Sequence, residues 1–204
     1  MQTDEGYIKF KADWEQAPPL PGTALAELNG WRDKMYDLGL IGAYENGIGF
    51  GNISCRWKNS AQFIISGSAT GNFKKLTAQH YALVTAVDID QNRLVCKGPV
   101  IASSESMSHA MVYQALPEVQ GVIHVHHLEL WEKLLHQVPT TAPDATYGSP
   151  EMAYSILQLI EETDLREQRI FVMEGHREGV FAFGESLKAA AEVLYHFGRR
   201  FALY

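Results

Sequence analysis

The chain has 204 residues, of which 46% are hydrophobic, and this suits one globular domain with a substantial core. Its net charge of −7 excludes the basic surface that is typical of a nucleic-acid binder. Its two cysteines, Cys55 and Cys96, lie far apart and argue against a disulfide scaffold or a thiolate zinc site.

The sequence contains no segment that would direct the chain to a membrane. Residues 1–5 are acidic and lack the apolar core of a signal peptide. No apolar run is long enough to span a bilayer. We therefore expect a soluble cytoplasmic protein that binds neither nucleic acid nor membrane.

The N-terminal part predicts a short strand and a first helix. Residues 7–11 alternate in polarity and could form an edge strand within an N-terminal extension. Three prolines then interrupt regular structure up to residue 21. A helix is expected at residues 23–38, with Thr23 as its N-cap and Gly39 as its stop.

Strands dominate the middle of the chain. A glycine-rich turn leads into the first strand, a turn at Asn59 and Ser60 follows it, and a loop of small residues, 66–72, follows the second strand. The hairpin-like spacing favours a largely antiparallel or mixed sheet. We expect these strands at residues 52–57, 63–65, 81–89 and 94–97.

The second half of the chain alternates helices with strands, so the whole sequence predicts one layered α/β domain, 1–204. Ser103 or Ser104 could cap a helix that ends near residue 116. Ser149 could cap another, with proline at the first helical position. The remaining elements are a strand at 122–127, helices at 128–136 and 150–162, strands at 170–173 and 180–183, and a final helix from Ser186 to the C-terminus.

The strand at 122–127 carries two histidines within an apolar run. Alternate side chains of a strand share a face, so His124 and His126 point the same way, as neighbouring ligands of one metal would. A zinc ion that takes part in catalysis commonly has three protein ligands and an open position. The alternative is a pair of core histidines that bond to backbone groups.

Three other clusters could complete such a site. His176 follows a glycine on a tight connection and could be a third ligand, although a loop histidine is more often a surface residue. Ser103, Ser104 and Glu105 stand at a helix start, where exposed N–H groups attract anions. The alternatives are a simple N-cap and a solvated pair between Glu105 and His109.

The third cluster is a pair of glycine-containing loops, 49–52 and 66–72. Such loops can hold phosphate through backbone N–H groups. Neither loop matches a P-loop or a dinucleotide-binding fingerprint, so each is a weak signal by itself.

Taken in order, these motifs resemble the class II aldolase/adducin family over residues 25–203. The resemblance implies a three-layer α/β fold with a central, mostly antiparallel sheet flanked by helices. It also implies a homo-oligomer, usually a tetramer, that acts in carbohydrate metabolism on a small-molecule substrate. The motifs that carry it are Gly51-Asn-Ile-Ser54, the small-residue loop with Lys75-Leu-Thr77, Ser103-Ser-Glu105, His124-Val-His126, Ala145-Thr-Tyr-Gly148 and Gly175-His176.

The resemblance assigns a role to each matching position. The cofactor is expected to be a divalent metal, with Zn2+ ahead of Mn2+, Co2+, Ni2+ and Fe2+. Glu105 matches the acid–base carboxylate. The expected metal ligands are His124, His126 and His176, and the expected substrate-phosphate residues are Asn52, Thr70, Gly71, Ser103 and Ser104.

The implied activity is that of a metal-dependent lyase on a small, sugar-phosphate-like hydroxy-carbonyl compound, through a metal-stabilised enediolate. The alternatives are a non-catalytic adducin-like binding module and an epimerase, dehydratase or decarboxylase on the same metal site. The sequence departs from the aldolases in three places. The connection 138–144 is short and lacks a matching tyrosine, and a C-terminal tail is missing. The turn after His176, with Arg177 and Glu178, is longer and more charged than the usual His-Gly turn.

Overall fold

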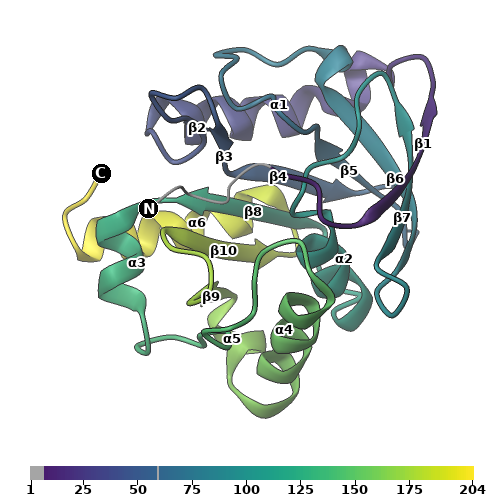
Figure 1. The fold of residues 1–204 in the computed structure, drawn as a ribbon. Helices are drawn as coiled ribbons and strands as arrows, with labels where there is room; N and C mark the ends of the chain where they lie inside the picture. Colours follow the sequence, from purple (N-terminus) through teal and green to yellow (C-terminus); the bar gives the residue numbers. More distant parts are fainter. Residues whose placement is uncertain (1–6, 59) are drawn as a thin grey trace.

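The computed structural model describes residues 7–58 and 60–204, which form one large sheet between two layers of helices (Figure 1). The eight strands follow the order β1-β7-β6-β5-β4-β8-β10-β9, and all neighbours are antiparallel except β1 and β7. This confirms the predicted fold class. The strands are β1 (Lys11–Gln16), β4 (Asn52–Arg56), β5 (Phe63–Ser66), β6 (Tyr81–Asp88), β7 (Arg93–Gly98), β8 (Gly121–His126), β9 (Ile170–Val172) and β10 (Gly179–Gly184). A small separate hairpin pairs β2 (Gly42–Ala43) with β3 (Gly49–Phe50).

The helices cover the two faces of the sheet and define two hydrophobic cores. On one face α2 (Ser106–Ala115), α4 (Pro150–Glu162) and α5 (Leu165–Gln168) contribute Met107, Ile156 and Leu165. On the other face α1 (Gly22–Asp37), α3 (Leu128–Leu134) and α6 (Leu187–Arg200) contribute Leu28, Leu130 and Leu194. A short 3-10 helix, η1 (Ala78–His80), precedes β6. No helix among the described residues is long and apolar enough to cross a membrane.

The N-terminal strand lies later than predicted. It begins at Lys11 and runs parallel to β7, whereas residues 7–10 are not part of the sheet. Phe10 is buried in the core beneath α2 and α4, and the Tyr7 N–H donates to the Tyr147 hydroxyl at 3.1 Å. The alternating residues are therefore used for tertiary packing and not for a strand ladder. Residues 1–5 and Asn59, part of the predicted turn, lie outside the described residues.

Two predicted helix caps are wrong. Pro21 occupies the N-cap position of α1, so Thr23 lies inside the helix and caps nothing. The α2 helix begins at Ser106 with Glu105 at its N-cap, and neither Ser103 nor Ser104 occupies that position. The final helix also ends at Arg200, before the last residue. The caps predicted at Ser149 and Ser186 are confirmed, because each hydroxyl accepts a backbone hydrogen bond of its helix.

The β8 strand lies in the interior of the sheet, between β4 and β10, and all six of its residues are buried. Val122 packs in the core beneath α2, whereas Ile123 and Val125 pack in the opposite core. The alternation of side chains therefore directs His124 and His126 towards the α2 face. In register, His124 lies opposite Asn52 on β4, and His126 lies opposite Gly179 on β10.

Candidate metal and substrate site

Three histidines converge in the interior on the α2 side of the sheet. His124 and His126 come from β8, and His176 comes from the connection between β9 and β10. The Nε2 atom of His126 lies 3.1 Å from Nε2 of His124 and 3.1 Å from Nε2 of His176. All three are buried, and their ligand atoms lie within 4.8 Å of one another. The structure thus brings together the three residues expected as metal ligands, and together they could hold a metal ion.

The partners of the outer nitrogens determine where the protons lie on two of these rings. His124 Nδ1 lies 3.3 Å from the Val180 carbonyl, which only accepts, so Nδ1 carries the proton. The Tyr44 hydroxyl donates to Glu178 Oε2 at 2.8 Å and lies 3.0 Å from His126 Nδ1, so it accepts the proton on that nitrogen. Both rings therefore turn unprotonated Nε2 atoms towards each other.

These observations fit a metal ion bound by the three Nε2 atoms. Two lone pairs at 3.1 Å repel each other unless a cation lies between them. Bonds of about 2.0–2.1 Å to a tetrahedral metal would separate two nitrogens by about 3.3 Å. Burial and the neighbouring imidazoles hold the pKa of His124 and of His126 well below the usual range, and neutral imidazole is the form that binds metal.

A glycine allows the histidines to approach one another. A Cβ on Gly179 would lie 2.8 Å from His176 Cδ2 and 3.2 Å from His124 Cε1. The first distance is shorter than side chains tolerate, so any larger residue would displace the rings. The site therefore depends on the glycine at the start of β10 as well as on its ligands.

Glu105 lies beside the histidines and is 2% exposed. Its Oε2 accepts a hydrogen bond from Ser108 at 3.0 Å, whereas its Oε1 has no hydrogen-bond partner among the described residues. Oε1 lies 3.6 Å from His176 Nε2. Burial raises the pKa of Glu105 to about 7, an effect that the Ser108 hydrogen bond and the charge of Lys9 partly offset.

The two simpler interpretations of Glu105 are wrong. Its side chain makes no cap hydrogen bond, although the residue occupies the N-cap position of α2. A solvated pair with His109 is also excluded, because His109 is fully buried and bonds to Asn52 and Ser54 instead. The carboxylate is therefore available to a group bound near the histidines.

A small cavity of about 30 Å3 borders Glu105 and is lined by the β3–β4 turn with the first residue of β4, by the loop 67–71 and by residues 103–105. All five residues expected to hold a substrate phosphate line it, which brings the three weak sequence motifs into one place. Each of the five is at least partly enclosed by the surrounding loops. They are Asn52, Thr70, Gly71, Ser103 and Ser104.

The loop with Thr70 and Gly71 is held from behind by Arg32 of α1. This guanidinium is 1% exposed and donates to the carbonyls of Thr70, Gly71 and Lys74. A Cβ on Gly71 would lie 2.1 Å from the Gly42 carbonyl, so the loop packs against the β2–β3 hairpin only with glycine there. The conformation of this loop is therefore set by contacts with distant segments.

Sequence reasoning missed four side chains around the histidines. Tyr44 and Glu178 lock His126, and the Tyr147 ring lies 4.8 Å from the His176 ring. Lys9 Nζ lies 3.9 Å from the centre of the Tyr147 ring. Tyr44 is 82 residues from His126, so no local spacing could reveal the contact. Two of the four had a signal in the sequence, because Tyr147 belongs to the Ala145-Thr-Tyr-Gly148 motif and Glu178 follows Arg177 in the unusual turn after His176.

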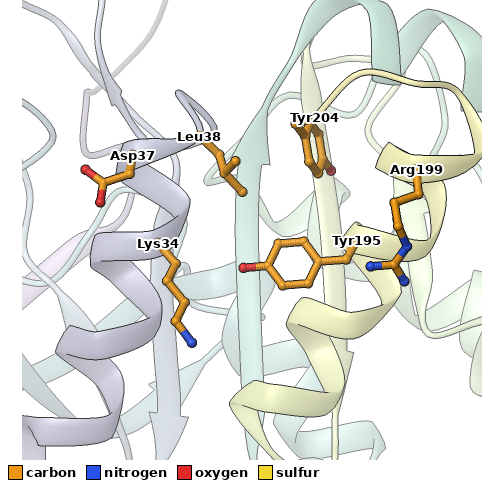
Figure 2. Close-up of a pocket in the computed structure, with 6 residues that line it drawn as sticks. All are labelled: Lys34, Asp37, Leu38, Tyr195, Arg199 and Tyr204. Carbon is orange, nitrogen blue, oxygen red and sulfur yellow. The ribbon is translucent and has the colours of Figure 1, made fainter.

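A different pocket, of about 460 Å3, lies between α1, α6 and the C-terminal residues (Figure 2). Lys34 and Asp37 reach it from α1, and Tyr195 and Arg199 reach it from α6. None of the expected site residues lines it.

The fold is that of class II aldolases, and it brings together three histidines that could hold a metal ion. The profile described as "Class II Aldolase and Adducin N-terminal domain" matches residues 35–131, which include Asn52, Glu105, His124 and His126. Over these residues the chain is similar to the class II aldolase and adducin family, and its fold agrees with that similarity.

Solved structures share the fold at low sequence identity. An L-fuculose 1-phosphate aldolase is 20% identical, with a TM-score of 0.67 over 91% of this chain and 87% of that one. A sugar-phosphate aldolase from Thermotoga maritima is 16% identical, with a TM-score of 0.62 over 87% and 91%. An aldolase II superfamily protein from Pseudomonas syringae is 15% identical, with a TM-score of 0.61 over 91% and 77%.

Proposed function

We propose that this chain is a metal-dependent lyase of the aldolase type that acts on a small, phosphorylated hydroxy-carbonyl compound. The observation that carries the proposal is the position of Glu105 Oε1, which lies 3.6 Å from His176 Nε2 and has no hydrogen-bond partner among the described residues. Leaving a buried carboxyl oxygen without a partner costs stability. A binding module would gain nothing from this arrangement, whereas an enzyme needs a free acid–base group at that position.

In this proposal His124, His126 and His176 hold one divalent ion, with zinc as the first choice. When bound, the metal would supply Lewis-acid chemistry to a substrate carbonyl. The protein fixes the rings through their outer nitrogens. The Val180 carbonyl holds His124, and the Tyr44 hydroxyl holds His126.

Glu105 would move the proton that aldol cleavage requires. The substrate hydroxyl loses its proton as the carbon–carbon bond breaks, and the carbon that keeps the electron pair must then gain one. Glu105 Oε1 is the buried group in reach of such a substrate, because Oε2 is held by Ser108. A pKa near 7 would let the carboxyl both accept and release a proton close to neutral pH.

Asn52, Thr70, Gly71, Ser103 and Ser104 would hold the substrate phosphate. Their position around one cavity beside Glu105 supports this role. The names of two structural relatives, an L-fuculose 1-phosphate aldolase and a sugar-phosphate aldolase, also support a phosphorylated substrate. A phosphate held there would place the rest of a small substrate next to Glu105.

The same site could instead serve an epimerase, a dehydratase or a decarboxylase, since these reactions share the metal chemistry. We also propose, on the family resemblance alone, that residues 1–204 form a single domain and that the protein is a cytoplasmic homotetramer. Light scattering should then give about four times the chain mass of 22.8 kDa. A species of the single-chain mass at micromolar concentration would contradict the tetramer.

The proposal is tested by loading the protein with zinc and screening phosphorylated ketoses and keto-acids for cleavage. We expect aldehyde release from at least one phosphorylated ketose, and none from the metal-free protein. Carbon dioxide release, water loss or epimerisation without cleavage would identify one of the other reactions. Full metal loading with no turnover across the screen would favour an adducin-like binding module.

A further inference from the structure

A chain of buried polar groups runs from Asn52, in the lining of the substrate cavity, to three residues behind it that the proposed chemistry does not use. His109 Nε2 lies 2.6 Å from Asn52 Oδ1, and His109 Nδ1 lies 2.7 Å from Ser54 Oγ. Ser54 Oγ lies 2.8 Å from the Tyr113 hydroxyl. His109 and Tyr113 stand one turn apart on α2, and Asn52 and Ser54 share one face of β4. We call these four residues the α2–β4 relay.

The direction of the hydrogen bonds along the relay follows from the donors available. Burial lowers the pKa of His109 to about 3, so the ring is neutral and carries one proton. With that proton on Nε2, the ring donates to Asn52 Oδ1, Ser54 donates to Nδ1, and Tyr113 donates to Ser54. Every hydroxyl and ring nitrogen of the relay then has a partner.

The opposite direction leaves a buried proton without a partner. If His109 carried its proton on Nδ1, Ser54 would accept from the ring and donate to Tyr113. The Tyr113 hydroxyl, at 3% exposure, has Ser54 as its side-chain partner, and the backbone N–H of Val122 can only donate to it, so its own proton would have no acceptor. Burying an unpaired polar group is unfavourable, and the first direction is therefore preferred.

The relay decides which end of the Asn52 side chain faces the cavity. Its Oδ1 is held by the His109 N–H, whereas its NH2 group has no hydrogen-bond partner within the described chain. Asn52 lines the cavity together with Ser103 and Ser104. A carboxamide could otherwise turn over and present its carbonyl, which would repel an anion.

We propose that His109 and Tyr113 are positioning residues that hold the Asn52 carboxamide with its NH2 group towards the cavity. The cavity then selects hydrogen-bond acceptors, such as the oxygens of a phosphate, over donors. Only the identity of the acceptor rests on the proposed function. The orientation of Asn52 stands on the hydrogen bonds of the relay.

The tautomer of His109 tests the proposal directly in the wild-type protein. Side-chain 15N spectra of histidine-labelled protein at pH 7 should show His109 with its proton on Nε2, and the signals should disappear in H109Q, which assigns them. The same tautomer should persist to pH 5. A proton on Nδ1, or a charged ring at pH 7, would overturn the proposal.

A second experiment measures what the orientation does, with inorganic phosphate as the probe. Calorimetry should show that Tyr113→Phe weakens phosphate binding by about fivefold, the worth of about one net hydrogen bond. KM for a phosphorylated substrate should rise by a similar factor with kcat nearly unchanged. Asn52→Asp, which keeps the shape but cannot donate, should abolish phosphate binding.

Ser54→Ala interrupts the relay at another point and should match Tyr113→Phe. Unchanged phosphate affinity in both folded variants would overturn the positioning role, because a purely structural pair would not act on the ligand. If the wild type shows the Nε2 tautomer but binds no phosphate, the proposed substrate class fails while the orientation of Asn52 stands.

Discussion

The two halves of the site are built in different ways. The metal half stands on the sheet, where β8 places His124 and His126 and β10 begins at the glycine that admits His176. The substrate half consists mostly of loops, together with Asn52 at the start of β4. Arg32, the α2–β4 relay and close glycine contacts hold it in place. Rigid strands give the more accurate placement, whereas loops tolerate variation.

This difference indicates which half of the site could change without loss of the other. A metal half fixed by strand register can be kept while the loops change the substrate. Glu105 lies at the junction, because it is at the N-cap of α2, next to Ser103 and Ser104, and also near His176. Variants in each half should therefore fail in different ways.

The largest effect on activity should come from replacing one of the three metal ligands. His126→Ala removes the ligand that lies closest to both other histidines, so we expect loss of stoichiometric metal and loss of turnover to background. Elemental analysis and activity on the substrate found by screening measure both. The exposed His196→Ala is the matched control and should keep both. Full metal content in the triple variant of His124, His126 and His176 would refute the ligand assignment.

A change at Glu105, which lies between the two halves, should lower turnover without weakening metal or phosphate binding. Glu105→Gln keeps the size of the side chain and loses proton transfer, so turnover should fall by about 10²–10⁴-fold. Metal content and phosphate affinity should stay near wild type. The exposed Glu118→Gln controls for the loss of one negative charge. Near-normal turnover in Glu105→Gln would show that Glu105 is not the acid–base group.

Variants of the residues that hold the metal ligands in place should have a smaller but measurable effect. Tyr44→Phe removes the hydroxyl that accepts from His126 Nδ1, and Glu178→Gln weakens the partner of that hydroxyl. Each should lower zinc affinity by about 10–100-fold, with the fold intact. Competition with a chromogenic chelator measures this, and Tyr154→Phe on the surface is the control. Wild-type affinity in both variants would mean that the contact has no role in metal binding.

The smallest effect should be the contribution of His109 to the pH dependence of the free energy of unfolding. The pKa of His109 is about 3 in the folded chain, against about 6.5 in an unfolded one, so only the unfolded state gains a proton as the pH falls below 6.5. The contribution of the neutral His109 ring to the free energy of unfolding is therefore fully present above pH 6.5. It is lost towards pH 3, by up to about 1.4 kcal/mol per pH unit. Urea unfolding between pH 7 and 5 should show a shallower loss in His109→Gln. Equal slopes in the two proteins would contradict a buried neutral ring.

The comparison also explains how much could be predicted from the sequence. The period of two on β8 was enough to pair His124 with His126, and hydrophobic patterns predicted most strands and helices. The third ligand and Glu105 came from the order of motifs, and the structure places both beside the first two. Tyr44, Arg32 and the α2–β4 relay depend on contacts between distant segments, which no local pattern records. The misplaced N-terminal strand has the same cause, since Phe10 packs in the core instead.

The central claim is that one divalent ion is bound by three histidines next to Glu105. Anomalous diffraction at the zinc edge, from crystals of zinc-loaded protein, tests it most directly. We predict one strong peak per chain, within bonding distance of the Nε2 atoms of His124, His126 and His176, with Glu105 facing its open side. A protein that carries no metal there after loading, or a peak held by other residues, would contradict the account.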